Sequence, residues 1–200
     1  MSPRRSSREG LLDAAEAVVR GSGAAHLTLD AVCARAGISK GGLLYHFRTK
    51  EALLLAMVER LHRAYAGAIR REAAKLPPSP ARELKAFIRA HGVLQQERMR
   101  GIAGALLAAG AHDPRLLKPV RVVRRAMIGK LRAPGMSAAF IELAVLVLDG
   151  MWQLELLGIS AQTQQQRRAV IRELLRLVDA EEARSSSRAV TRARRGPGRA

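Results

Sequence analysis

The chain has 200 residues, 48% of them hydrophobic, enough to bury the core of one medium domain or of a small domain joined to a larger one. Its 35 Lys and Arg against 17 Asp and Glu give a net charge of +18 and a pI near 11.6, which favours a nucleic-acid partner. A single cysteine excludes an intrachain disulfide and a cysteine-based metal cluster, and we expect no metal and no cofactor.

The N-terminus begins with a basic arm, residues 1–8, which has arginines and no acidic residue. An amphipathic pattern with Glu9 and Asp13 follows it, rather than an apolar signal region, so we expect no secretion signal. Ser6 or Ser7 is placed to cap a first helix. This helix has an apolar stripe and ends near two glycines, Gly21 and Gly23; the stripe is Leu11, Leu12, Ala15, Val18 and Val19.

Between Thr28 and Lys50, two short helical patterns meet at Gly37. Thr28 is a good N-cap for the first helix and Ser39 for the second, while a glycine just past a helix end can take the left-handed conformation that closes the turn. Cys33 falls on the apolar face of the first helix, where we expect it to pack in the core. The spacing predicts a helix-turn-helix.

In the second of these helices, Leu43 and Phe47 lie four residues apart and can face the core. The adjacent glycines Gly41 and Gly42 each cost a helix about 1 kcal/mol relative to alanine. We interpret them as allowing the first turn to approach DNA closely, so that its free N–H groups lie near phosphates. The alternative is that glycines in a first turn simply cost little.

The segment from Ala36 to Leu53 resembles the tetracycline-repressor (TetR) family of transcriptional regulators. It matches the family's pattern of Ala-Gly, a β-branched residue, Ser-Lys-Gly, then Leu, an aromatic residue, His-Phe and finally Ser/Thr-Lys-Glu-x-Leu. The resemblance covers roughly residues 9–55 and implies a DNA-binding homodimer with an effector pocket.

Carried over by position, the resemblance implies that Lys40 and the two glycines lie at the edge of a DNA groove, that Tyr45 and His46 reach phosphates or bases, and that Lys50 holds a phosphate. Two positions depart from the family pattern: Gly42 stands where a hydroxyl residue is frequent, and Leu44 where an aromatic is frequent. We therefore expect sparse base contacts, with Lys40 donating to guanine and Leu44 touching a thymine methyl group. The expected DNA-binding set is Thr28, Ser39, Lys40, Gly41, Gly42, Leu44, Tyr45, His46 and Lys50.

A long helix is predicted from Lys50 to about Lys75, where three nearby prolines stop it. Such a rod can carry a displacement between DNA and an effector domain contacted at Leu61, Tyr65 and Ile69. Further helices are predicted at about 81–97, 99–111, 114–132, 137–158 and 162–183. The only β-like run, residues 145–148, lies inside a longer helical pattern, so the fold class is all-α.

We therefore divide the chain into the arm 1–8, a three-helix DNA-binding domain 9–55, a helical effector-binding and dimerisation domain 56–183, and a basic, disordered tail 184–200. Six arginines and no acidic residue occur in the tail. It either steers the protein to DNA without specifying sequence or serves as a solvated, solubilising segment.

The last two predicted helices have apolar residues at three- and four-residue steps. We expect them to meet their twofold mates in a four-helix dimer interface; the alternative is a wholly intramolecular core. The expected interface residues are Phe140, Leu143, Val147, Met151, Leu154, Val170, Ile171, Leu174, Leu175 and Val178.

A small-molecule effector is expected between the middle helices, with Trp152 supplying stacking area and Gln153 a polar group. Because aromatic residues make up only 3% of the chain, we expect an apolar or amphipathic effector of unknown identity rather than a large planar one. The candidate lining is Phe87, His91, Met99, Met127, Trp152 and Gln153, most of which can equally be ordinary core.

We expect a cytoplasmic, ligand-responsive repressor that binds a pseudo-palindromic, double-stranded operator as a homodimer. No membrane span is expected, because acidic residues interrupt the apolar stretch 140–157. The alternatives are a non-switching architectural DNA-binding protein and a helical enzyme using, for example, His91 with Glu97. The five histidines are scattered and no HExxH, GxSxG or phosphate-binding loop occurs, so we expect no catalytic residue.

Overall fold

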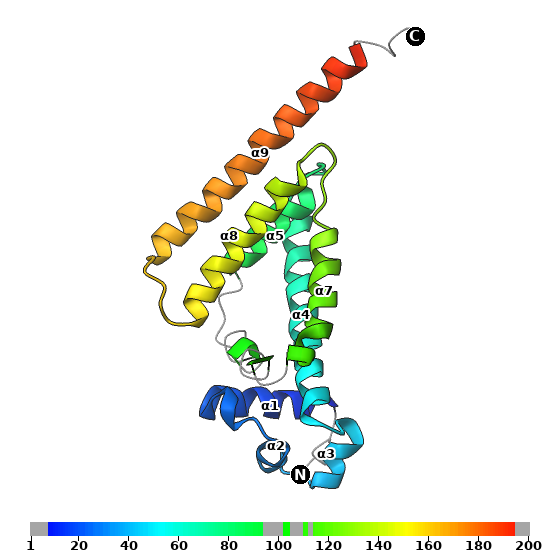
Figure 1. Cartoon of the computed structure of the whole chain (residues 1–200), viewed down its shortest axis with the longest axis vertical. Helices are drawn as coiled ribbons and strands as arrows, with labels where there is room; N and C mark the ends of the chain where they lie inside the picture. Colours follow the sequence, from blue (N-terminus) through cyan, green and yellow to red (C-terminus); the bar gives the residue numbers. More distant parts are fainter. Residues whose placement is uncertain (1–7, 94–101, 105–109, 112–113, 195–200) are drawn as a thin grey trace. The chain divides into compact units, whose positions relative to one another are not determined.

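The computed structural model describes residues 8–93, 102–104, 110–111 and 114–194, and the described part contains helices and turns but no strand (Figure 1). The predicted all-α class is confirmed. The chain divides into two compact units. The first is Met1–Tyr65 with Gln95–Arg125, and the second is Ala66–Leu94 with Ala126–Ala200.

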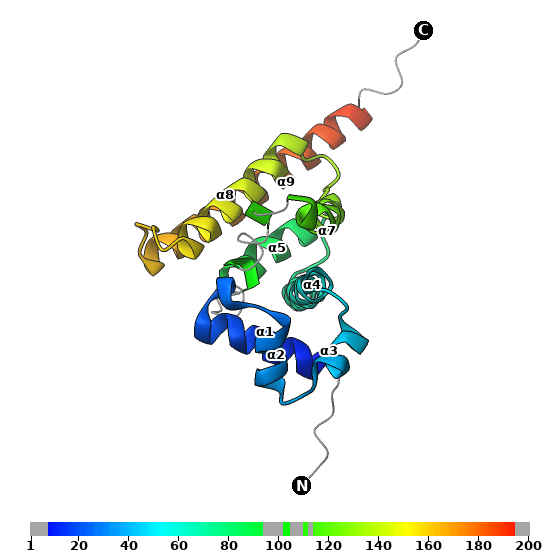
Figure 2. The same ribbon diagram turned by 60° about the horizontal axis from the view of Figure 1, so that its bottom comes forward.

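The first unit contains the helix-turn-helix segment. Its elements are α1 (Arg8–Ser22), the short 3-10 helix η1 (Ala24–His26), α2 (Leu29–Ala36), α3 (Lys40–His46) and the first part of α4 (Lys50–Ala74) (Figures 1 and 2). The capping residues Ser6 and Ser7 lie outside the described residues. All five residues of the predicted apolar stripe on α1 are buried, and they pack with Val32, Leu43, Phe47 and Met57 in one core.

Helix α4 starts where the sequence predicts, because the Thr49 hydroxyl accepts a hydrogen bond from the Ala52 N–H at 3.1 Å. Leu61, which was predicted to contact an effector domain, packs against the core of the first unit. It lies two turns beyond Leu54, so it continues the same buried face. Ile69, in the second unit, is buried there.

The second unit is built around α5 (Arg82–Val93), which packs against both α8 (Ala138–Leu156) and α9 (Gln164–Arg194). Helix α9 runs in the opposite direction to α8 (Figure 1). An ionic cluster fastens the start of α5 to α9: Lys85 Nζ lies 2.7 Å from Asp179 and 2.6 Å from Glu182, and Glu182 also accepts the Ala81 N–H.

This cluster changes the ionisation of its members. Partial burial disfavours the charged forms, but the hydrogen bonds between Lys85 and its two acidic partners raise the pKa of Lys85. Likewise, burial works against the Glu182 carboxylate, yet the hydrogen bonds from Lys85 and from the Ala81 N–H keep the pKa of Glu182 below its usual range.

Before α8, Pro114–Leu117 form the 3-10 helix η2 and α7 spans Lys118–Gly129. The helix predicted at 114–132 therefore begins with a 3-10 turn and ends at residue 129. Most of the predicted helix 99–111 lies outside the described residues. The predicted disordered tail is wrong for 184–194, because α9 continues through Arg194. This segment consists largely of alanine, arginine and serine, with no glycine or proline before Gly196 to stop the helix. No helix in the described part is long and apolar enough to cross a membrane.

Candidate nucleic-acid interface

The turn between α2 and α3 is fixed by three local devices that the sequence predicts. The Thr28 hydroxyl accepts the Ala31 N–H at 3.1 Å and the Ser39 hydroxyl accepts the Gly42 N–H at 3.2 Å, so each serine or threonine caps its helix. Gly37 has φ 68° and donates its N–H to the Cys33 carbonyl, closing α2 in the left-handed conformation. Cys33 is buried, as expected.

Helix α3 has one buried and one exposed side. Leu43 and Phe47 are buried in the core. Tyr45 is 85% exposed, an unusual degree for an aromatic side chain, and Leu44 is also exposed. The rings of Tyr45 and His46 meet edge to face with centroids 5.0 Å apart. The exposed side therefore offers an aromatic hydroxyl and a small apolar contact.

The two glycines of α3 are not required by the fold of this chain. Neither has a positive φ. A Cβ atom on Gly41 would approach nothing closer than the Ser39 hydroxyl at 4.0 Å, and one on Gly42 would make ordinary contacts of 3.5 and 3.7 Å. Backbone strain and internal crowding thus do not explain the pair, which leaves either approach by an external partner or simple tolerance of glycine in a first turn.

The two candidate lysines differ in their surroundings. Lys40 Nζ lies 3.0 Å from the Asp30 carboxylate, and both side chains are largely exposed, so this ion pair is weak and can exchange for a phosphate or base. Lys50 is the first residue of α4 and is half-buried.

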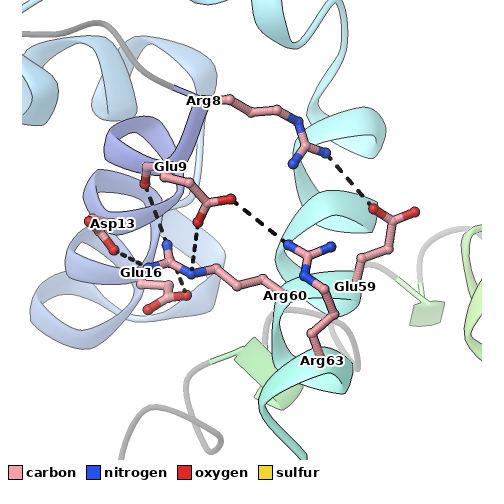
Figure 3. A network of polar contacts seen from close by, with 7 residues as sticks. All are labelled: Arg8, Glu9, Asp13, Glu16, Glu59, Arg60 and Arg63. Carbon is pink, nitrogen blue, oxygen red and sulfur yellow. Dashed lines mark hydrogen bonds and ion pairs between the residues drawn. The ribbon is translucent and has the colours of Figure 1, made fainter. Parts of the chain in front are cut away.

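A network of ion pairs holds α1 against α4 (Figure 3). Arg60 lies among three carboxylates of α1: its guanidinium nitrogens are 2.5 Å from Asp13, 3.4 Å from Glu9 and 3.7 Å from Glu16. Arg63 also pairs with Glu9 at 3.8 Å. Glu16 is only 4% exposed, so Arg60 supplies a counter-charge for a carboxylate that is removed from water.

The first residue of α1 links this network to α3. Arg8 pairs with Glu59 at 3.8 Å (Figure 3). Its guanidinium also lies 5.3 Å from the centroid of the ring of Phe47, the C-cap residue of α3, in a cation–π contact. This network was not predicted from the sequence. Its visible signal is the spacing of acidic residues 9, 13 and 16, which places them along one side of a helix.

Both parts of the chain match models of one protein family. The model of bacterial regulatory proteins of the tetR family matches residues 11–57, and the model of the tetracyclin repressor-like C-terminal domain matches residues 81–179. The chain belongs to the tetracycline-repressor family. It is therefore a transcriptional regulator and not an enzyme, and the resemblance seen in residues 36–53 is confirmed.

Several solved structures share the fold of this chain. The multidrug binding protein EbrR complexed with imidazole is 26% identical, with a TM-score of 0.62 over 86% of this chain and 93% of that chain. EbrR complexed with ethidium is 26% identical, with a TM-score of 0.64 over 87% and 99%. A TetR-family member from Streptomyces coelicolor A3 is 26% identical, with a TM-score of 0.66 over 84% and 96%. No curated protein matches the sequence.

The residues expected to line an effector pocket are placed unevenly. Phe87 is buried in α5, and its ring lies beside that of His91 with centroids 6.3 Å apart. Trp152 on α8 is half-buried, as is Met127 on α7, while Gln153 is exposed. Met99 lies outside the described residues. Gln153 is thus not brought together with the buried residues of its unit.

The residues expected at the dimer interface differ in their exposure. Leu174 and Val178 are already buried within the subunit, so they are unavailable to a second copy. Leu143 is 53% exposed. The half-buried remainder comprises Phe140, Val147, Met151, Leu154, Val170, Ile171 and Leu175.

One exposed residue of α8 was missed. Leu146 is 58% exposed and, three residues after Leu143, shares its side of the helix together with Gly150 and Gln153. Its sequence signal was hidden inside the continuous apolar run 145–148, in which only the three buried or half-buried neighbours face the subunit.

Proposed function

We propose that this regulator is a repressor that binds a pseudo-palindromic operator as a homodimer in the cytoplasm and is released by a small apolar or amphipathic effector. The observation that carries the proposal is the exposed side of α3. Tyr45 and Leu44 are exposed there, next to two glycines that neither backbone strain nor crowding within the subunit requires.

The homodimer is supported by the exposed leucines of α8, since Leu143 and Leu146 form an apolar surface that a single subunit leaves in water. A twofold axis would place two copies of α3 in successive major grooves, about 34–36 Å apart. The proposed switch is a shift from a conformer with this spacing to one without it, and the effector must favour the second.

Binding of a small molecule is supported by analogy to the multidrug binding protein EbrR, whose structures contain imidazole and ethidium, while the apolar or amphipathic character of the effector rests on the low aromatic content of this chain. By linkage, an effector that weakens operator binding tenfold must itself bind tenfold more weakly to the DNA complex, a coupling of about 1.4 kcal/mol. Reciprocal titrations of operator and effector test this equality. If the effector strengthens operator binding, the protein is a corepressor-dependent regulator, and the proposed release is wrong.

Footprinting of the DNA upstream of the gene tests the operator directly. We expect protection of one short palindrome, relieved by a small molecule. Protection that no compound relieves would favour the architectural DNA-binding protein, and equal binding to operator and random DNA would contradict sequence-specific regulation.

Two lysine variants assign the contacts. Lys50→Ala should weaken binding to every duplex and reduce the dependence of log K on log salt by about 0.9, the value for one phosphate. Lys40→Ala should instead reduce discrimination at a particular base pair. Lys75→Ala is the control, because it removes one exposed lysine at the far end of the α4 region, where Lys75 pairs with Glu72. If Lys50→Ala leaves both affinity and salt dependence unchanged, its phosphate contact is excluded.

A further inference from the structure

One end of the second unit has more arginines than acidic residues, and these arginines lie outside the helix-turn-helix segment. In α9 the last acidic residue is Glu182, and every charged residue after it is an arginine. Positions 184, 188 and 192 lie four apart and so share one side of the helix. In Figure 1 the last turns of α9 extend beyond the ends of α5 and α8.

The acidic residues that precede these arginines are already paired. Glu182 and Asp179 both bind Lys85, and Glu181 lies 3.0 Å from Arg184. They are therefore poor counter-charges for arginines further along the helix. Arg188 is exposed, and no ion pair is seen for it among the described residues.

A second segment of the chain adds to the same charge. The turn between α7 and α8 is attached to α9, because Ser185 donates its hydroxyl to the Gly135 carbonyl at 2.5 Å. The contact is close: a Cβ atom on Gly135 would lie 2.8 Å from the Ser185 Cβ, and Gly135 has φ +83°. This turn contains Lys130 and Arg132, both exposed.

We define the basic end of the second unit as Lys130, Arg132, Arg184 and Arg188, together with helical positions 192 and 194. No acidic residue occurs between Asp113 and Glu142, nor after Glu182, so both contributing segments have only positive charge. The surface is therefore suited to a partner with many negative charges.

We propose that this basic end is a second DNA-contacting surface, which binds the sugar–phosphate backbone of a duplex without reading its bases. Five of its six basic residues are arginines, and the planar guanidinium matches a phosphate with two parallel hydrogen bonds. A membrane surface is a poorer fit, because residues 179–194 contain no bulky apolar residue larger than Val190, whereas helices that lie on membranes have Leu, Phe or Trp on one face.

The proposal goes beyond the operator contact made by α3, and the two are separable by measuring operator and random-sequence duplexes in parallel over a salt series. Two double variants of the intact protein remove the charges in pairs: Arg188→Gln/Arg192→Gln and Lys130→Gln/Arg132→Gln. The matched control is Arg70→Gln/Arg71→Gln, which removes two exposed arginines from α4 in the same unit.

For each double variant at the basic end we expect the slope of log K against log salt to fall by about two for both duplexes, one phosphate per removed charge. The ratio of operator to random-sequence affinity should stay unchanged. The control should keep the wild-type slope, and urea unfolding should show that all three variants are folded.

Two results would overturn this second surface. One is a slope that changes no more in the double variants than in the control. The other is unchanged DNA binding accompanied by weaker binding to anionic phosphatidylserine vesicles, which would make the surface a membrane contact. If the wild-type protein bound operator and random-sequence duplexes equally well, the proposed function would be contradicted. The change in salt slope would still test the basic end.

Discussion

Two glycines in α3 are the residues whose presence the fold explains least. Replacing Gly41 or Gly42 with alanine introduces no clash and improves helix propensity, so we expect each variant to be more stable by up to about 1 kcal/mol. If the bare backbone permits close approach to DNA, the same variants should bind the operator more weakly. Urea unfolding and operator titration of the same samples measure both effects.

Gly67→Ala is the control for this pair, because Gly67 lies inside α4 and its added Cβ would meet only the flexible ends of Arg70 and Arg71. It should raise stability and leave operator affinity unchanged. Wild-type affinity in both Gly41→Ala and Gly42→Ala would favour the alternative, that a first turn simply tolerates glycine.

At the scale of residues, local pattern predicted most of what local physics determines. The caps at Thr28 and Ser39 and the left-handed Gly37 each depend on neighbours within four residues, and the burial of Leu43 followed from its helical spacing with Phe47. The ion pair of Lys40 with Asp30 and the contact of Arg8 with Phe47 were not predictable in this way, because they join residues on different elements.

The brace between α1 and α4 leads to a prediction about elements. Arg60→Ala removes the guanidinium that pairs with three carboxylates of α1, one of them the buried Glu16, so we expect a loss of about 3 kcal/mol in the free energy of unfolding. Urea unfolding at neutral pH measures it. Replacing Glu16 by Gln in the Arg60→Ala background should restore part of the loss, since a neutral amide is less costly to bury than a carboxylate.

Arg63→Ala is the comparison for this brace, because Arg63 is more than half exposed and makes one 3.8 Å pair. Its cost should be below about 1 kcal/mol. Equal losses in the two arginine variants would show that burial of Glu16 does not set the strength of the network.

The cluster that ties α5 to α9 makes stability depend on pH. Because the folded state holds the pKa of Glu182 below its unfolded value, its contribution is present above that unfolded value and is lost as pH falls through the lower, folded one. We expect Glu182→Gln to be less stable than wild type at neutral pH and to show a shallower decline on acidification. Urea unfolding between pH 7 and pH 3 measures both.

Glu83→Gln controls for the removal of one carboxylate, since Glu83 is exposed on α5. It should follow the wild-type pH profile. A Glu182→Gln profile parallel to wild type would mean that the carboxylate does not couple folding to protonation.

The ends of helices were predicted correctly where a capping residue or a proline marks them. Prolines after residue 76 end the α4 region near the predicted place, and Thr49 begins it. The end of α9 was placed too early, because a change from mixed charge to arginine alone does not interrupt a helix. The packing of Leu61 on the first core was also not predicted, since period alone cannot tell which partner covers an apolar face.

The whole molecule is expected to associate through α8. Leu143→Glu and Leu146→Glu each place a charge in the proposed interface, so each should convert the homodimer to monomer at micromolar concentration and weaken operator binding. Sedimentation velocity measures the first effect. Val122→Glu is the control, because Val122 is 67% exposed on a different helix, α7, and this variant should remain a dimer. A wild-type monomer at the same concentration would exclude the proposed assembly.

At this scale the family and the all-α class were evident from one motif and from helical periodicity. The division of the chain was not: residues 95–125 belong with the first unit, although the sequence groups them with the helices that follow. Ile102 in the core of the first unit shows the reason, since its partners are distant in sequence.

The ion-pair network around Arg60 also determines where the DNA-binding domain of one such regulator can be joined to the remainder of another. A hybrid joined at residue 55, the end of the recognisable motif, takes its brace from whatever residue the donor has at position 60. If that residue is uncharged, the hybrid loses the ion pairs of Arg60 with α1, including the one to the buried Glu16 carboxylate. A junction after Arg63 transfers the motif with its own counter-charge and with Leu61, and is the better cut site for exchanging operator specificity between family members.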